Sequence, residues 1–295
     1  MPELNALILP HRGFLDIRGD VAKSFLQALI SNDTSRLSAS QALYAALLTP
    51  QGKYLFDFFL YDDHAGVLLE SREDTLDDLQ RRLTLYRLRT AVEITRVQSP
   101  PSILALFGQD VFAVFDIPAE PGTVRKLGEL RLIVDPRRAE MGVRVMGPFQ
   151  AVSALAYQYG AHNVTLSAYE RHRIELGVPE GGVDLLPNQS ILLESNFEEL
   201  HGVAFDKGCY IGQELTARTK YRGLVKKRLV PVAIDGQPPA AGELIMADHR
   251  EAGEIRSVAG DRALALLRLD YLDGQTQLRS REARILPLPL PWAKA

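Results

Sequence analysis

The densest group of chemically active residue types is the segment 206–218, which reads Asp-Lys-Gly-Cys-Tyr-Ile-Gly-Gln-Glu-Leu-Thr-Ala-Arg. It contains Cys209, the only cysteine of the chain, with a glycine on either side that permits unusual backbone conformations. The residues after Gly212 favour a helix, so we expect Cys209 just before a helix N-terminus, with Lys207 two residues away. A helix dipole and an ammonium group both favour a thiolate, which predicts a lowered thiol pKa. The alternative is a small buried cysteine at a tight turn, the more common setting of a lone cysteine.

An aspartate in an apolar segment is the second candidate. Asp57 lies within residues 53–61, flanked on both sides by leucine and phenylalanine. The segment is rich in aromatic residues and apolar on both faces, which predicts a central strand. A carboxyl group there must be paired, hydrogen-bonded or protonated, because desolvating a bare carboxylate is costly. Asp57 is therefore either a functional carboxylate lining a pocket or a structural one satisfied by neighbouring backbone.

A basic run is the third feature, with six cations and no acid in the eleven residues 218–228. Such a run suits the anionic tail of a ligand, a phosphate-bearing cofactor or RNA. No aromatic-interleaved nucleic-acid motif accompanies it, so RNA is not the expected partner. The alternative is a solvated linker between two parts of the chain.

Composition and missing motifs exclude several functional classes. One cysteine rules out an intrachain disulfide and a thiolate-based zinc site. The six histidines show no HxxxH or HExxH spacing, and GxxxxGK[ST], GxGxxG and GxSxG motifs are missing, so we expect no resident metal. The net charge is −3, no apolar run reaches the roughly 18–20 residues of a membrane-spanning helix, and the start resembles no signal or transit peptide. We therefore expect a soluble intracellular protein without a membrane partner.

The 295 residues predict two or three domains. Up to residue 205, helical and strand patterns mix at short spacing, which indicates an α+β layout. Asp20 is expected to cap one helix, and Ser71 with Asp74 to form the capping box of another. From residue 224, short alternating segments separated by turn signals predict a small β-barrel or sandwich, with strands at 228–234, 243–246, 254–258 and 263–268.

The signature Lys-Gly-Cys-Tyr-Ile-Gly-Gln-Glu, followed by Arg218, resembles that of the YgfZ proteins. These form the iron–sulfur-cluster assembly branch of the superfamily that also contains the glycine-cleavage aminomethyltransferase, or T-protein. Further resemblance covers nearly the whole chain and is clearest at residues 17–27, 31–34, 48–53, 173–179 and 193–196. The aspartate in Tyr-Leu-Phe-Asp, Asp57, is similar to the mitochondrial-type branch.

The resemblance implies an α+β, T-protein-like fold with a small C-terminal β-barrel, arranged around a central pocket. It divides the chain into two interleaved folate-binding subdomains at 1–205, a signature loop and helix at 206–223, and the barrel at 224–295. It implies binding of tetrahydrofolate or a derivative, a role in assembling or repairing iron–sulfur clusters, and an association with tRNA modification. The expected compartment is a bacterial cytoplasm, or the mitochondrial matrix if the chain is eukaryotic.

On this basis Cys209 and Asp57 are the candidate catalytic residues, and Cys209 is a candidate transient ligand of an iron–sulfur cluster. The candidate folate-binding residues are Asp57, Arg173, Glu194, Lys207 and Arg218. The expected partners are iron–sulfur carrier proteins and cluster-containing client enzymes. The alternative is a folate-dependent aminomethyl or one-carbon transferase with Asp57 as general base.

Overall fold

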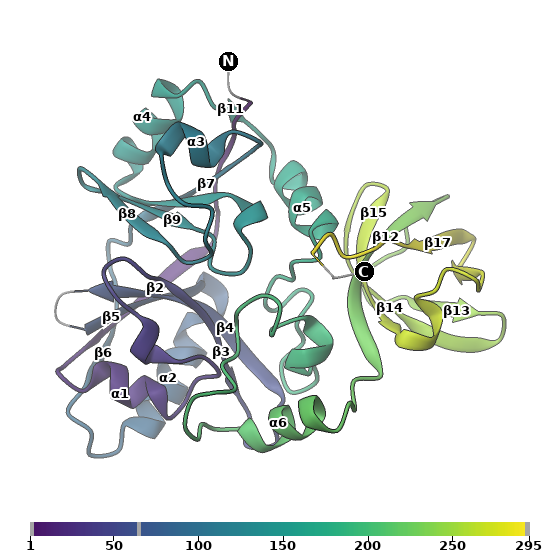
Figure 1. The fold of residues 1–295 in the computed structure, drawn as a ribbon, viewed down its shortest axis with the longest axis horizontal. Helices are drawn as coiled ribbons and strands as arrows, with labels where there is room; N and C mark the ends of the chain where they lie inside the picture. Colours follow the sequence, from purple (N-terminus) through teal and green to yellow (C-terminus); the bar gives the residue numbers. More distant parts are fainter. Residues whose placement is uncertain (1–2, 64–65, 293–295) are drawn as a thin grey trace. The chain divides into compact units, whose positions relative to one another are not determined.

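The computed structural model describes residues 3–63 and 66–292, which divide into two compact units (Figure 1). The first unit comprises Met1–Val164 and Glu198–Gln213, and the second comprises Thr165–Phe197 and Glu214–Ala295. The chain therefore leaves the first unit, returns to it for the segment that contains Cys209, and leaves it again.

One sheet of the first unit carries Asp57. Its five strands follow the order β3-β4-β5-β2-β6, and every pairing is antiparallel. The strands are β2 (Arg12–Arg18), β3 (Leu43–Leu48), β4 (Tyr54–Asp63), β5 (Gly66–Arg72) and β6 (Glu93–Arg96). Helices α1 (Ala22–Gln27) and α2 (Leu76–Arg87) lie beside this sheet (Figure 1). Their apolar side chains belong to its core. The prediction of a central strand around Asp57 is confirmed, because β4 lies between β3 and β5.

The other sheet of the first unit has six strands in the order β11-β1-β7-β10-β9-β8. They are β1 (Asn5–Ile8), β7 (Ser102–Phe107), β8 (Val124–Leu127), β9 (Leu130–Val134), β10 (Val143–Gly147) and β11 (His162–Asn163). Helices α3 (Val111–Phe115) and α4 (Phe149–Gln158) complete its core. The two sheets are interleaved in sequence, because β2–β6 fall between β1 and β7.

Buried ion pairs join the two sheets of the first unit. The fully buried Glu70 of β5 accepts hydrogen bonds from Arg12 at 2.6 Å and from Arg144 of β10 at 2.5 Å. Burial alone would raise the pKa of Glu70, but the two guanidinium groups hold it below its ordinary value. The sheets are thus fixed to each other by charges that are costly to separate in a dry interior.

The second unit contains a closed barrel of order β12-β15-β14-β13-β16-β17. Its strands are β12 (Lys227–Asp235), β13 (Leu244–Ala247), β14 (Arg250–Ala259), β15 (Arg262–Arg268), β16 (Leu278–Ser280) and β17 (Ala283–Pro287). Helix α5 (Leu166–Glu175) and the 3-10 turn η4 (Leu192–Ser195) belong to this unit, and α6 (Gln213–Tyr221) begins at the boundary. The four barrel strands expected from the sequence are present, and β16 and β17 complete the closure.

Two expected helix caps are wrong. Helix α1 has Val21 rather than Asp20 at its N-cap, without a side-chain cap. Ser71 is the penultimate residue of β5, and its hydroxyl donates to the main-chain oxygen of Asp57 at 2.9 Å instead of capping a helix. Pairing with β2 and β4 outweighs the local capping signal at Ser71.

Among the described residues, no helix is long and apolar enough to cross a membrane.

Candidate functional site: an oriented carboxylate and an exposed thiol

The carboxylate of Asp57 is held by two tyrosine hydroxyl groups. Tyr44 of β3 donates to Oδ2 at 2.9 Å, and Tyr54 of β4 donates to Oδ1 at 2.6 Å. Both tyrosines are buried, whereas Asp57 is partly exposed. A carboxylate oxygen can accept more than one hydrogen bond. Asp57 is therefore a partly exposed carboxyl group whose orientation is set in part by two tyrosine hydroxyl groups.

The side chain of Cys209 is exposed, so the alternative of a buried cysteine is wrong. Its neighbours in sequence are placed differently, because Lys207 and Tyr210 are both buried. Helix α6 begins at Gln213, four residues after the cysteine. The thiol therefore stands on the outside of a short segment that is anchored on both sides.

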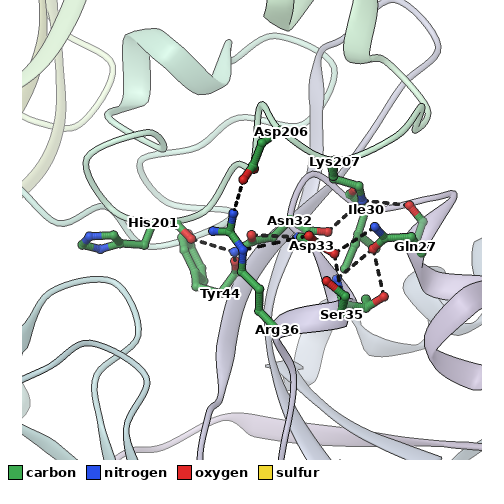
Figure 2. A network of polar contacts seen from close by, with 11 residues as sticks. Gln27, Ile30, Asn32, Asp33, Ser35, Arg36, Tyr44, His201, Asp206 and Lys207 are labelled. Carbon is green, nitrogen blue, oxygen red and sulfur yellow. Dashed lines mark hydrogen bonds and ion pairs between the residues drawn. The ribbon is translucent and has the colours of Figure 1, made fainter.

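The ammonium group of Lys207 is the inner anchor (Figure 2). It donates to three main-chain oxygens, those of Gln27 at 2.8 Å, Ile30 at 2.8 Å and Asn32 at 2.7 Å. Burial lowers the pKa of Lys207 to about 8, and the nearby Asp33 carboxylate only partly offsets this. Because all three N–H donors are used by carbonyl groups, none of them serves the thiol.

Further bonds fasten the residues just before Lys207 to the same part of the first unit. Ser31 donates from its hydroxyl to the oxygen of Gly202 at 2.6 Å, and its own main-chain oxygen accepts from Ala204 at 3.0 Å. The exposed Arg36 and Asp206 side chains form an ion pair at 2.5 Å (Figure 2). Residues 201–212, here called the Cys209 loop, are thus held by many contacts to residues 27–36.

Gly212 ends the Cys209 loop where no other residue fits. Its φ is +81°, and a Cβ atom there would lie 2.6 Å from the main-chain oxygen of Thr49. A larger side chain is therefore excluded both by backbone strain and by contact with the turn before β4. The glycine expected from the sequence to allow an unusual backbone conformation is confirmed in that role.

Asn32 connects the Cys209 loop with the Asp57 carboxylate. Its main-chain oxygen accepts from Lys207, while its side-chain amide donates to the oxygens of Tyr44 and His201, both at 2.7 Å (Figure 2). Tyr44 in turn binds Asp57 through its hydroxyl group. An open cavity of about 480 Å³ is lined by Asn32, Tyr44 and His201 together with Arg36, Glu198 and Val203.

Arg173, expected to bind folate, is completely buried in the second unit. Its guanidinium group donates to Asp184 at 2.7 Å, to the oxygen of Val178 at 3.2 Å and to Glu170 at 2.8 Å. Asp184 also accepts from the main-chain nitrogen of Ser257 in the barrel at 3.0 Å. In this structure Arg173 therefore joins α5 to the following segment and to the barrel.

The remaining expected site residues of the second unit lie at its surface. Arg218 is exposed on α6. Glu194 lies in η4 and lines an open cavity of about 370 Å³, together with Lys226, Lys227 and Arg256. Part of the basic run thus faces a cavity of its own unit, and Lys227 also lies 3.5 Å from Glu251.

Sequence reasoning missed Tyr44, Tyr54 and Asn32 as parts of the site. Tyr54 lies three residues before Asp57 and offered the one local signal, a donor close in sequence to a carboxylate. Tyr44 reaches Asp57 only because β3 pairs with β4, with Ala46 opposite Asp57. The central pocket expected from the resemblance stays a prediction.

Comparisons with known proteins agree with this fold. The model of the CAF17 C-terminal β-barrel domain matches residues 226–295. The aminomethyltransferase T of the glycine cleavage system from Bartonella henselae superimposes with a TM-score of 0.79, over 99% of this chain and 87% of that one, at 16% identity. This confirms the expected T-protein-like fold.

Two relatives show the family. The mitochondrial iron–sulfur cluster assembly factor IBA57 of Homo sapiens is 35% identical over 93% of this chain and 80% of its own length. The same factor of Mus musculus is 33% identical over 94% of this chain and 81% of its own length. The expected mitochondrial-type branch agrees with these names, while the YgfZ label itself stays a prediction. The chain belongs to the IBA57 family of iron–sulfur cluster assembly factors.

Proposed function

We propose that this chain works in iron–sulfur cluster assembly and that Cys209 presents its thiolate to the cluster or to the client enzyme. The observation that carries the proposal is the exposure of the single thiol on a loop fastened to the first unit. The names of the relatives, iron–sulfur cluster assembly factors of mitochondria, supply the class of function. For a eukaryotic source, the place of action is the mitochondrial matrix.

A single thiolate accounts for one ligand of a cluster, and such clusters generally take four. Within residues 3–63 and 66–292, no group of three or more histidine, cysteine, aspartate or glutamate side chains is arranged to hold a metal ion. The cluster is therefore treated as cargo, held in a transient complex to which a carrier protein or client enzyme contributes the other ligands. Exposure of Cys209 suits such a complex because a partner can reach the sulfur directly.

The proposal is tested by complementing cells that lack this protein, at matched expression, with wild type, Cys209→Ala or Lys126→Met. The measured quantity is the activity of an endogenous [4Fe–4S] enzyme relative to its protein level. We expect rescue by wild type and by Lys126→Met, which alters an exposed lysine of β8, and no rescue by Cys209→Ala. Equal rescue by Cys209→Ala would show that the thiol has no part in the function.

Tetrahydrofolate or a derivative is the ligand that we propose for Asp57. The carboxylate fits the pterin ring, whose adjacent N–H groups can donate to both oxygens of an oriented, partly exposed carboxylate. Lys207 and Arg173 do not fit a role at the anionic glutamyl tail, because their donors are used within the protein. Arg218 and Glu194 stay candidates for that ligand.

Calorimetric titration with tetrahydrofolate tests this assignment. Asp57→Asn keeps the size of the side chain but removes its charge, so we expect affinity to fall by roughly 10- to 100-fold, as for a lost charged hydrogen bond. Asp110→Asn, at an exposed position before α3, is the matched control. Equal affinity of wild type and Asp57→Asn would overturn the assignment.

A folate-dependent one-carbon transferase is the second candidate, and the orientation of Asp57 favours it. A carboxylate held by two phenol groups is placed to accept a proton from a bound amine. This candidate requires a turnover that is lost in Asp57→Asn and retained in Cys209→Ala. The cluster-assembly proposal requires the opposite dependence on Cys209 in the complementation experiment.

A further inference from the structure

Among the expected site residues, Lys207 stands out because all three of its N–H groups donate to main-chain oxygens of the same unit that are 175–180 residues away in the sequence. The three oxygens that it binds belong to the end of α1 and the turn that follows, about residues 27–33. The last carbonyl groups of a helix have no partner within the helix, and a cation placed there satisfies them. Lys207 thus completes the end of α1 from a position 180 residues later in the sequence.

The burial of this ammonium group without a bonded carboxylate is unusual. The residue is 8% exposed, and its three hydrogen-bond acceptors are neutral. Asp33 acts on it through space, while Asp206 in its own loop is paired with Arg36. The ring of Tyr210 lies 5.0 Å from the nitrogen on the remaining side. The ammonium group of Lys207 is therefore held by main-chain oxygens and not by an ion pair.

We propose that Lys207 is a positioning residue that docks the Cys209 loop on residues 27–33 and thereby fixes the direction in which the thiol is presented. Lys207 and Tyr210 are buried on either side of Gly208 and Cys209, so the exposed pair has little freedom while both anchors stay in place. The importance of this direction for cluster assembly rests on the proposed function. The docking itself is a property of the loop and is measured without any cluster.

A spin label attached to Cys209 tests the positioning role, and the absence of any other cysteine gives a spectrum free of background. We expect slow label motion in wild type and in Lys126→Met, and faster motion in Lys207→Met, whose side chain keeps the apolar stem but loses the donors. Circular dichroism of each variant confirms that it is folded. Equal label motion in Lys207→Met and Lys126→Met would overturn the proposal.

Hydrogen exchange of residues 204–210 in the unlabelled proteins provides a second readout. At one fixed pH we expect faster exchange of these amides in Lys207→Met than in wild type and Lys126→Met, because the loop has lost its three hydrogen bonds to residues 27–32. Equal exchange in Lys207→Met and Lys126→Met would contradict the proposed docking through Lys207. Neither experiment involves a cluster, so a failure of the docking is distinguished from a failure of the proposed function, which complementation by Cys209→Ala reports.

Discussion

Each unit of the molecule buries more than one long cationic side chain, and two of these, Arg173 and Lys207, differ in the kind of partner they bind. In the second unit, Arg173 binds the carboxylates of Asp184 and Glu170. In the first unit, Lys207 binds three neutral carbonyl groups. Burial lowers the pKa of both groups, but at Arg173 the two carboxylates outweigh it and raise the pKa above its ordinary value. At Lys207 burial prevails, and the pKa falls to about 8.

The difference teaches that burial of a charge serves two purposes in this chain. Arg173 keeps its charge at every pH at which the protein is folded, so it is a permanent cross-link of the second unit. Lys207 titrates near neutral pH, so the segment that it holds can respond to solution conditions. Arg173 connects structural elements of the second unit. Lys207, whose charge changes with pH, lies two residues from Cys209 in the sequence.

The largest expected effect is that of Arg173→Met. Removal of the guanidinium group leaves Asp184 buried with an unpaired charge, which is expected to cost about 3–5 kcal/mol of unfolding free energy. Denaturant unfolding measures this cost, and Arg171→Met, at a partly exposed position, serves as the control, with a loss below about 1 kcal/mol. Similar losses in both variants would mean that the buried pair is no stronger than a surface one.

Lys207→Met is expected to cost less, about 1–2 kcal/mol. Three hydrogen bonds are lost, but the cost of burying a charge is removed at the same time, so the two effects partly cancel. The same unfolding experiment measures it beside Arg173→Met. A loss of unfolding free energy as large as that of Arg173→Met would show that carboxylate and carbonyl partners stabilise a buried cation equally. The contrast drawn between Arg173 and Lys207 would then be wrong.

The stability of wild type relative to Lys207→Met should depend on pH. Between about pH 8 and pH 10.5 the unfolded chain holds more of the Lys207 proton than the folded chain, so the unfolding free energy rises with pH in that window. This contribution is complete above about pH 10.5 and is lost as the pH falls through about 8. We expect a rise of about 1–2 kcal/mol, allowing for partial access of water.

Unfolding experiments at several pH values measure this dependence as the difference between the two proteins. Arg173 contributes no slope in the same window, because its guanidinium stays protonated there. A difference that falls as the pH rises would contradict the assigned direction of the Lys207 shift.

Tyr44→Phe tests how a neutral donor holds the Asp57 carboxyl group and has the smallest expected effect. The substitution removes one donor to Asp57 while Tyr54 remains, so stability should fall by about 1 kcal/mol. Thermal unfolding measures it, with Tyr157→Phe at a 90% exposed position as the control. No difference between the two variants would show that the Tyr44 hydroxyl does not hold the carboxylate.

Local patterns in the sequence were enough to predict much of the fold. The central strand around Asp57 and four barrel strands were predictable because their alternation or aromatic content is read over four or more residues. The short β16 has three residues, and β17 ends at Pro287, so neither carries a clear pattern. Ser71 was misread as a helix cap because its use is decided by strand pairing, which no local signal contains.

For the site, too, residue types were predictable from the sequence and partners distant in the chain were not. A reactive cysteine segment was predictable from residue types alone. The partners of Lys207 lie 175–180 residues away in the sequence, so its use as an anchor follows only from the folded chain. Those of Arg173 lie within eleven residues, yet their pairing with it was not predicted, because the local sequence does not show which nearby carboxylates become buried.

The closure of the barrel has a consequence for biosynthesis. Strand β17, nearest the C-terminus, pairs with both β12 and β16. During translation, β12 therefore exposes an unpaired edge until residue 287 has left the ribosome, and such edges are sites of intermolecular pairing. A nascent chain stalled before β17 would keep that edge open, whereas the first unit, whose last segment ends at Gln213, can already be complete. The edge of the barrel thus stays open to intermolecular pairing after the first unit has been fully synthesised.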